Sequence, residues 1–223
     1  MKMINGQIVP ENLTLSELEE MMESSNMQAF AVACEALRLV NTRQAYEILK
    51  KYIRVLDRYK RRYVLSVIFD FSDSNELISE LEYALQSEDI ILVTTALNNI
   101  IQGKVRVKDE LVFACIEKNR KSIDHWHYNV LTSVEKTERN LELILKLYYA
   151  CKEDSCRIVI AECLQTFCNS DNYLRLFDLF KEDAVSHIRI IACRIAKDYA
   201  RVDLLQKFVQ DKDGHIRKLA LSK

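Results

Sequence analysis

The run Asp124-His125-Trp126-His127-Tyr128 is the densest group of chemically active side chains in the chain. It holds the only tryptophan and two of the four histidines. If the run is helical, two positions separate the histidines, which then point about 200° apart at about 100° per residue. They cannot ligate one metal together, and no nucleophile that a histidine could activate lies nearby in sequence. The pattern of this run therefore identifies no catalytic residue. It predicts either a binding surface containing Trp126 and Tyr128 or a packing role for the tryptophan.

A second candidate is a basic stretch with interleaved tyrosines. Residues 43–62 hold eight basic and two acidic residues, whereas residues 70–89 hold seven acids and no Lys or Arg. These runs cancel in the net charge of -1 but not in space. The stretch is either a solvated face or a patch for an acidic partner or for phosphates, with weaker support for base stacking on its tyrosines. We expect Arg58, Arg61 and Arg62 to contact a partner.

The seven cysteines do not have the spacing of a metal site. Four of them, Cys151, Cys156, Cys163 and Cys168, are five, seven and five residues apart, whereas zinc sites use tight pairs. Free cysteine packs as a small hydrophobe, so we expect reduced cysteines in the core of a cytoplasmic protein. With only three glycines, the chain also lacks a glycine-rich phosphate loop. We expect no metal and no cofactor.

Composition predicts an all-α protein. Average usage of about 7% Gly and about 5% Pro would give roughly 27 such residues in this length, but the chain has three Gly and one Pro. Turn-rich β folds need both residue types. No segment resembles a signal peptide, and none approaches the roughly 18 apolar residues of a membrane span. We therefore expect no membrane partner.

A weak internal repeat organises these helices. Small or polar residues recur every 28 to 33 positions, and a small side chain lets neighbouring helices approach closely. One phrase also occurs twice, as Ser186-His187-Ile188-Arg189 and as Gly214-His215-Ile216-Arg217, each after an acidic turn. The recurring positions are Ala33, Ser66, Ala96, Asn129, Ala161, Ala192 and Ala220.

This unit resembles the HEAT repeat, in which an acidic turn joins helix A to a helix B that opens with an apolar-Arg pair. The resemblance implies a ladder of turn Asp and helix-B Arg residues between successive repeats. It assigns that role to Asp183, Arg189, Asp211, Asp213 and Arg217. Arg157 is an off-register version, and the earlier units carry Val93 and Trp126 near the arginine position.

We therefore predict a single domain over residues 1–223, built as a right-handed α-solenoid of about seven HEAT-like helix pairs. Residues 1–13 are a loose lead-in. Residues 14–23 form an acidic N-terminal cap helix that Thr14 and Glu17 open with a capping box. The predicted repeats cover about 14–40, 42–71, 74–102, 107–135, 138–167, 170–199 and 201–222.

A solenoid presents an extended concave surface, so we expect a non-enzymatic module of the adaptor, scaffold, regulatory or immunity type that binds another protein. Self-association through the C-terminal repeat is a second expected contact. One alternative is a DNA-binding protein similar to the HEAT-like alkylpurine DNA glycosylases. Asp124, Trp126 and Tyr128 would then act on a base, although a pI near 6.5 is low for duplex binding. A bilin lyase-like HEAT protein is another. The predicted concave contact residues are Arg58, Arg61, Arg62, Trp126, Tyr128, Arg194 and Lys197.

Overall fold

The fold comes from a computed structural model, which describes residues 2–4, 7–9, 12–53, 55, 57–68, 71, 74–103 and 106–222. For 2–4, 7–9 and 74–76 only the backbone is described. Apart from one short pair of strands, the described elements are helices, so the predicted all-α class is confirmed. None of the described helices combines the length and the hydropathy that crossing a lipid bilayer requires. The chain divides into two compact units, Met1–Ile123 and Asp124–Lys223.

The first unit begins with a pair of strands where we predicted a loose lead-in. Strands β1 (Lys2–Ile4) and β2 (Gln7–Val9) pair antiparallel, with Met3 opposite Ile8, and β2 packs on helix α2. The helices of this unit are α1 (Leu15–Glu23), α2 (Met27–Val40), α3 (Arg43–Lys50), α4 (Arg58–Ile68), α5 (Ser74–Leu85), α6 (Ile90–Ile101) and α7 (Asp109–Asn119).

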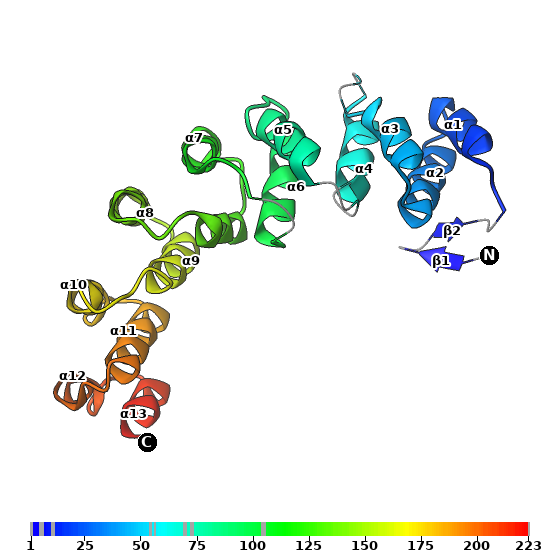
Figure 1. The fold of residues 1–223 in the computed structure, drawn as a ribbon. Coiled ribbons are helices and arrows are strands. Elements are labelled where there is room, and N and C mark those ends of the chain that lie inside the picture. The colour runs from blue at the N-terminus through cyan, green and yellow to red at the C-terminus, as the bar shows by residue number, and fades with distance from the viewer. Residues whose placement is uncertain are drawn as a thin grey trace. The chain divides into compact units, whose positions relative to one another are not determined.

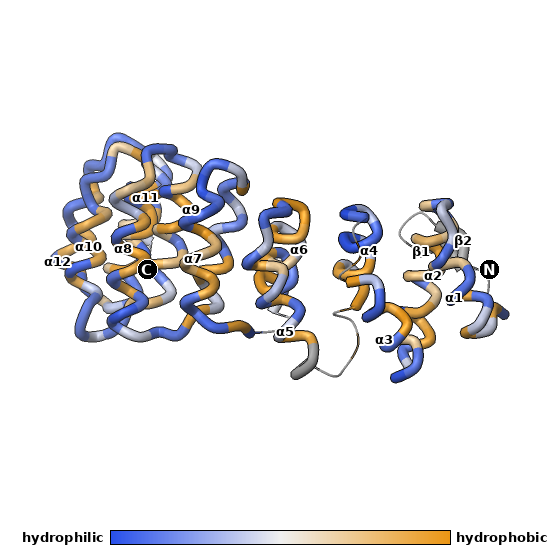
Figure 2. The backbone as a smooth tube through the Cα atoms, turned by 90° about the horizontal axis from the view of Figure 1, so that it is seen from above, coloured by the Kyte–Doolittle hydropathy of each residue, from blue (hydrophilic) through white to orange (hydrophobic). Residues whose placement is uncertain are grey.

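These helices form two layers (Figure 1). In one layer α2 contacts α4 and α4 contacts α6, while α1, α3 and α5 each pack on the helix that follows them in sequence. Helix α6 is hydrophobic over much of its length (Figure 2), which suits its position against both α4 and α5. Phe30 of α2 is fully buried and meets the ring of Tyr52 edge to face, with centroids 5.6 Å apart.

The second unit repeats this arrangement. Its elements are the 3-10 helix η1 (His125–Ser133), α8 (Glu138–Ala150), α9 (Asp154–Gln165), α10 (Tyr173–Phe180), α11 (Ser186–Asp198), α12 (Val202–Leu205), the 3-10 turn η2 (Gln206–Phe208) and α13 (Gly214–Leu221). Within this unit η1 contacts α9, α9 contacts α11 and α11 contacts α13, with α8, α10 and α12 on the other side (Figure 1). Phe177, Phe180 and Phe208 form its largest fully buried side chains.

Local signals in the sequence correspond to helix ends. Thr14 and Glu17 form the capping box that opens α1, as predicted. Gly103 follows α6 with φ +71°, a left-handed conformation that glycine adopts without the strain a side chain brings. The expected first helix of the last pair is less regular, since α12 has four residues and continues as a 3-10 turn.

The element at residues 125–133 differs from the expected α-helix. Asn129, Thr132 and Ser133 each donate a side-chain hydrogen bond to the backbone carbonyl three residues earlier, at 2.7–2.8 Å. Side chains that bond their own backbone in this way compete with α-helical hydrogen bonds, and the segment takes the tighter 3-10 form. The repeat position Ser66 is also misassigned, because it is exposed on α4, whereas Ala33, Ala96, Ala161 and Ala192 are fully buried.

Candidate functional site

Helix α4 divides into a buried side and an exposed side. Asp57 begins it, because its Oδ1 accepts hydrogen bonds from the backbone N–H groups of Tyr59 at 2.8 Å and Lys60 at 3.1 Å. The side that packs in the core consists of Val64, Leu65, Val67 and Ile68. The opposite side is a continuous stripe at helical spacing, because positions three and four residues apart are neighbours on a helix. We call this stripe the α4 face, and it consists of Arg58, Tyr59, Arg62, Tyr63 and Ser66.

The structure does not assemble the predicted basic stretch into one patch. Lys51 forms an ion pair with Glu19, and Lys60 Nζ donates to the backbone carbonyl oxygens of Met22 at 3.3 Å and Ser24 at 2.8 Å. Arg61 is also engaged, as described below, and Arg54 lies outside the described residues. Much of the positive charge therefore joins one helix pair to the next.

Arg58 and Arg62 remain at the surface with two exposed tyrosines. Tyr59 and Tyr63 are 50% and 37% exposed. Arg58 stacks on Tyr59, with its guanidinium carbon 4.9 Å from the ring centroid, and its Nη2 donates to the phenol oxygen at 3.0 Å. Within the part of the chain that the structure describes, Arg62 has no ion-pair or hydrogen-bond partner.

The α4 face is hollowed. Tyr59, Arg62, Tyr63 and Ser66 line a depression of about 300 Å³. A guanidinium can take a carboxylate or a phosphate with two parallel hydrogen bonds, and phenol rings offer large rigid apolar area with a polar tip. Arg and Tyr are the residue types enriched at the energetic centres of protein interfaces. The chemistry of this face is therefore recognition of an anionic group beside an apolar one.

A different set of arginines joins successive helix pairs. Arg189 of α11 is 4% exposed, and its Nε and Nη2 donate to the two carboxylate oxygens of Asp211 at 2.8 and 2.9 Å. Its Nη1 donates to the backbone oxygens of Asp183 and Ala184 at 2.8 and 3.1 Å. The structure thus brings Arg189 and Asp211 together. We call such an arginine–aspartate contact between successive helix pairs a rung, and this is the first of them.

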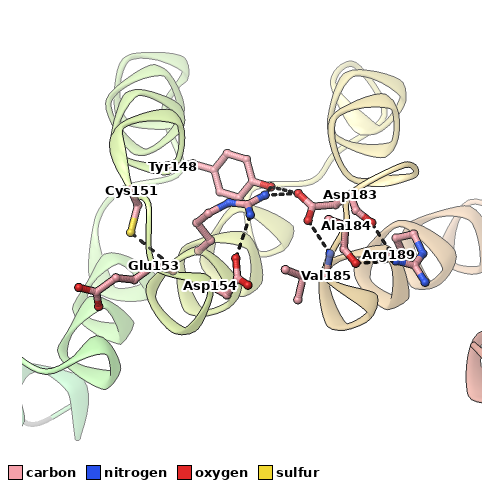
Figure 3. A network of polar contacts seen from close by, with 9 residues as sticks. Tyr148, Cys151, Glu153, Asp154, Asp183, Ala184, Val185 and Arg189 are labelled. Atoms are coloured by element: carbon pink, nitrogen blue, oxygen red, sulfur yellow. Dashed lines mark hydrogen bonds and ion pairs between the residues drawn. The ribbon is translucent and has the colours of Figure 1, made fainter.

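A second rung joins α9 to the turn before α11 (Figure 3). Arg157 forms an ion pair with Asp183, and Tyr148 donates its phenol O–H to the same carboxylate oxygen at 2.9 Å. The other oxygen of Asp183 accepts the backbone N–H of Val185 at 2.9 Å. Burial raises the pKa of Tyr148 to about 12, so its O–H stays a donor at neutral pH. Arg157, which lies off the register of the repeat, therefore also forms an arginine–aspartate rung.

Arg61 forms a third rung, which sequence reasoning missed. We predicted Arg61 as a partner contact, but its Nη2 lies 2.9 Å from Asp89, and both side chains are less than 20% exposed. The available signal was the separation along the chain, which is 28 residues here and 26 and 22 residues for the other two rungs. The predicted ladder role of Asp213 and Arg217 is not observed, because both make local contacts. Asp213 caps α13 through the N–H of His215 at 2.8 Å, and Arg217 Nη1 donates to the backbone oxygens of Asp211 and Lys212 at 2.6 and 3.1 Å.

The Arg189 rung predicts how stability depends on pH. Its hydrogen bonds hold the pKa of Asp211 below the usual range, whereas an unfolded Asp titrates near about pH 3.9. The stabilisation is therefore complete above that pH and is lost as pH falls through the lower, folded-state pKa. We expect Asp211→Asn to lower the free energy of unfolding at pH 7 and to reduce its decline between pH 5 and pH 3, measured by urea unfolding. Glu182→Gln, at an exposed carboxyl, should retain the wild-type decline, and an unchanged decline in Asp211→Asn would contradict the assignment.

The predicted group at 124–128 is divided between exposed and buried side chains. Trp126 is 37% exposed and stacks on the ring of His127 at 4.1 Å, whereas Tyr128 is 3% exposed. His127 Nδ1 accepts the backbone N–H of Asp124 at 3.1 Å. Burial lowers the pKa of His127, so the ring is neutral at pH 7. The prediction that Tyr128 reaches a partner is wrong, because its side chain is buried. Residues two apart point about 200° apart on an α-helix and about 240° apart on a 3-10 helix, so Trp126 and Tyr128 do not form the shared surface that the glycosylase alternative needs.

The remaining predicted contacts lie on α11. Arg194 is exposed, and Lys197 Nζ donates to the backbone and hydroxyl oxygens of Ser222 at 3.1 and 2.8 Å. Lys197 therefore ties α11 to the end of α13.

Five of the seven free cysteines are buried, and no cluster of metal-ligating side chains occurs among the residues whose placement is described.

Comparison with known proteins identifies no family. No protein-family profile and no curated protein matches the chain. Among solved structures, the chain is similar to an engineered protein at 15% sequence identity, with 92% of each chain covered and a TM-score of 0.28. A likeness at that level carries no argument about this protein.

Proposed function

We propose that the chain is a HEAT-like helical-repeat module, a right-handed solenoid of about seven helix pairs, that binds an acidic segment of a partner protein on the α4 face. One observation carries the proposal: Arg62 is exposed, has no partner in the described structure and lines a hollow between two exposed tyrosines. The neighbouring Arg61 and Lys60 are held by other helix pairs, so the charge left on the face is available for a ligand.

The binding mode follows from the chemistry of the stripe. A partner carboxylate meets the guanidinium of Arg62, and an apolar side chain of the same partner packs on Tyr63 and Tyr59. Because a tyrosine side chain has only two χ angles, ordering these two rings costs little side-chain freedom on binding. The three rungs support the repeat architecture, because each joins a helix to the acidic turn of the following pair.

Charge reversal at Arg62 tests the proposal. The tagged chain is incubated with lysate of the cells that produce it, at 150 and 300 mM salt, and co-purifying proteins are quantified by mass spectrometry. We expect one stoichiometric protein, with Arg62→Glu and Tyr63→Ala each reducing its recovery at least about tenfold, as central interface residues contribute about 2 kcal/mol or more.

Lys152→Glu provides the matched control. It makes the same change in charge at an exposed position outside the α4 face, and recovery should equal that of the wild type. Equal recovery by Arg62→Glu would reject the α4 face as the binding site. Nucleic acid recovered only at the lower salt, without a protein, would instead support the nucleic-acid alternative, since phosphate contacts weaken steeply with salt.

A further inference from the structure

The guanidinium of Arg217 in α13 repeats half of the arrangement around Arg189. Arg189 Nη1 donates to the backbone oxygens six and five residues before it, at 2.8 and 3.1 Å. Arg217 Nη1 donates to the backbone oxygens six and five residues before it, at 2.6 and 3.1 Å. Both arginines follow an isoleucine that is completely buried. The two side chains are therefore held against their own turns in the same way.

The other edge of each guanidinium differs. Nε and Nη2 of Arg189 hold the carboxylate of Asp211, which the turn before α13 supplies. For Arg217 the described structure contains no ion pair or hydrogen bond at Nε or Nη2, and the residue is exposed. A guanidinium oriented by two backbone carbonyls, with its outer edge open, is prearranged for a bidentate carboxylate.

The apolar surroundings repeat as well. Cys193 lies four residues after Arg189, in the helix that α13 covers, and is completely buried. Leu221 lies four residues after Arg217 and is 66% exposed. Positions four apart share one side of a helix, so Arg217 and Leu221 form a charged and an apolar contact point on one surface, which we call the α13 face.

We propose that the α13 face binds a partner protein through an acidic turn followed by an amphipathic helix. The turn carboxylate pairs with Nε and Nη2 of Arg217, and the helix covers Leu221. Within the chain, the turn before α13 supplies such a carboxylate to Arg189, and α12 and α13 pack on α11. A second copy of this chain fits less well, because the rung carboxylates Asp89, Asp183 and Asp211 each already hold an arginine.

A peptide can test the face directly. The probe is a fluorescein-labelled peptide of residues 201–222, the segment that makes this contact with Arg189, titrated with the full chain and followed by fluorescence anisotropy. We expect saturable binding with a Kd on the order of 100 µM, weak because the peptide must fold as it binds. Asp211→Asn in the peptide should weaken binding at least about tenfold, because it removes the charge that pairs with Arg217.

Two variants of the full chain locate the binding surface. Arg217→Gln should weaken binding at least about tenfold. Leu221→Ser should weaken it about fivefold or more through lost apolar burial while leaving thermal unfolding unchanged, because Leu221 is exposed. Lys218→Gln removes an exposed charge from the same helix and should bind like the wild type.

The outcomes separate the alternatives. Absence of saturation up to 1 mM peptide, or binding that both Arg217→Gln and Leu221→Ser leave unchanged, overturns the proposal; the latter result would mean that the peptide displaces the chain's own α12 and α13. A dimer in sedimentation velocity that Leu221→Ser abolishes would assign the face to a second copy and also overturn it. The α4 face lies in the other unit. If Arg62→Glu does not reduce partner recovery, the proposed function fails, but the peptide test of the α13 face remains valid.

Discussion

Replacing Arg189 with Gln is expected to lower the free energy of unfolding by about 3–5 kcal/mol, the range for breaking a buried ion pair by removing one partner. The Arg189 and Asp211 side chains are only 5% and 9% exposed. Removal of the guanidinium leaves the Asp211 carboxylate without its countercharge, and it leaves the backbone oxygens of Asp183 and Ala184 without their donor. Urea unfolding followed by circular dichroism measures the loss.

An exposed ion pair provides the control for this prediction. Arg43 and Glu47 form an ion pair on α3 with side chains 54% and 48% exposed. Arg43→Gln should therefore cost less than about 1 kcal/mol. The double variant Arg189→Gln with Asp211→Asn should be less unstable than the sum of the single variants by at least about 1 kcal/mol, because the second change removes an unpaired charge. Additive losses of unfolding free energy in the double variant would contradict a direct interaction between Arg189 and Asp211.

Replacing Phe177 with Ala is expected to cost about 3–5 kcal/mol, the range for truncating a buried aromatic side chain. Phe177 of α10 is completely buried and meets the ring of Phe208 edge to face, with centroids 5.9 Å apart. The substitution therefore leaves a cavity between α10 and η2. The free energy of unfolding from urea titration is again the measurement.

Two further variants test the cavity explanation. Tyr149→Ala removes an aromatic ring that is 70% exposed and should cost less than about 0.5 kcal/mol. Phe208→Ala should be nearly as damaging as Phe177→Ala, and the double variant less than the sum, because the two rings share one contact. A loss below about 1 kcal/mol for Phe177→Ala would show that the core relaxes into the space.

The two proposed surfaces lie in different units and rest on different residues. The α4 face rests on Arg62 between Tyr59 and Tyr63, and the α13 face rests on Arg217 beside Leu221. Each has a variant that leaves the other surface unchanged. A partner lost with Arg62→Glu but retained with Leu221→Ser would bind the first surface, and the reverse pattern would identify the second.

Local sequence rules predicted much of the secondary structure. Three glycines and one proline indicated helices joined by short turns, and Thr14 with Glu17 marked the start of α1. The same rules failed at residues 125–133. There, side-chain hydrogen bonds to the backbone favour the 3-10 helix, and Tyr128 is buried whereas Trp126 is exposed. Capping and periodicity act within about one helical turn, so they are readable along the sequence.

The roles of individual arginines depended on tertiary structure. Arg61 and Arg62 are adjacent in a basic run, yet one pairs with Asp89 while the other faces solvent. Arg189 and Arg217 occur in the same phrase, yet only Arg189 meets a carboxylate. The physical reason is that successive residues of a helix point about 100° apart, and their partners lie 22 to 28 residues away. The sequence by itself determined which segments are helical and where charge is concentrated, and the packing of one helix pair on the next decided which charges stabilise the fold and which remain for a partner.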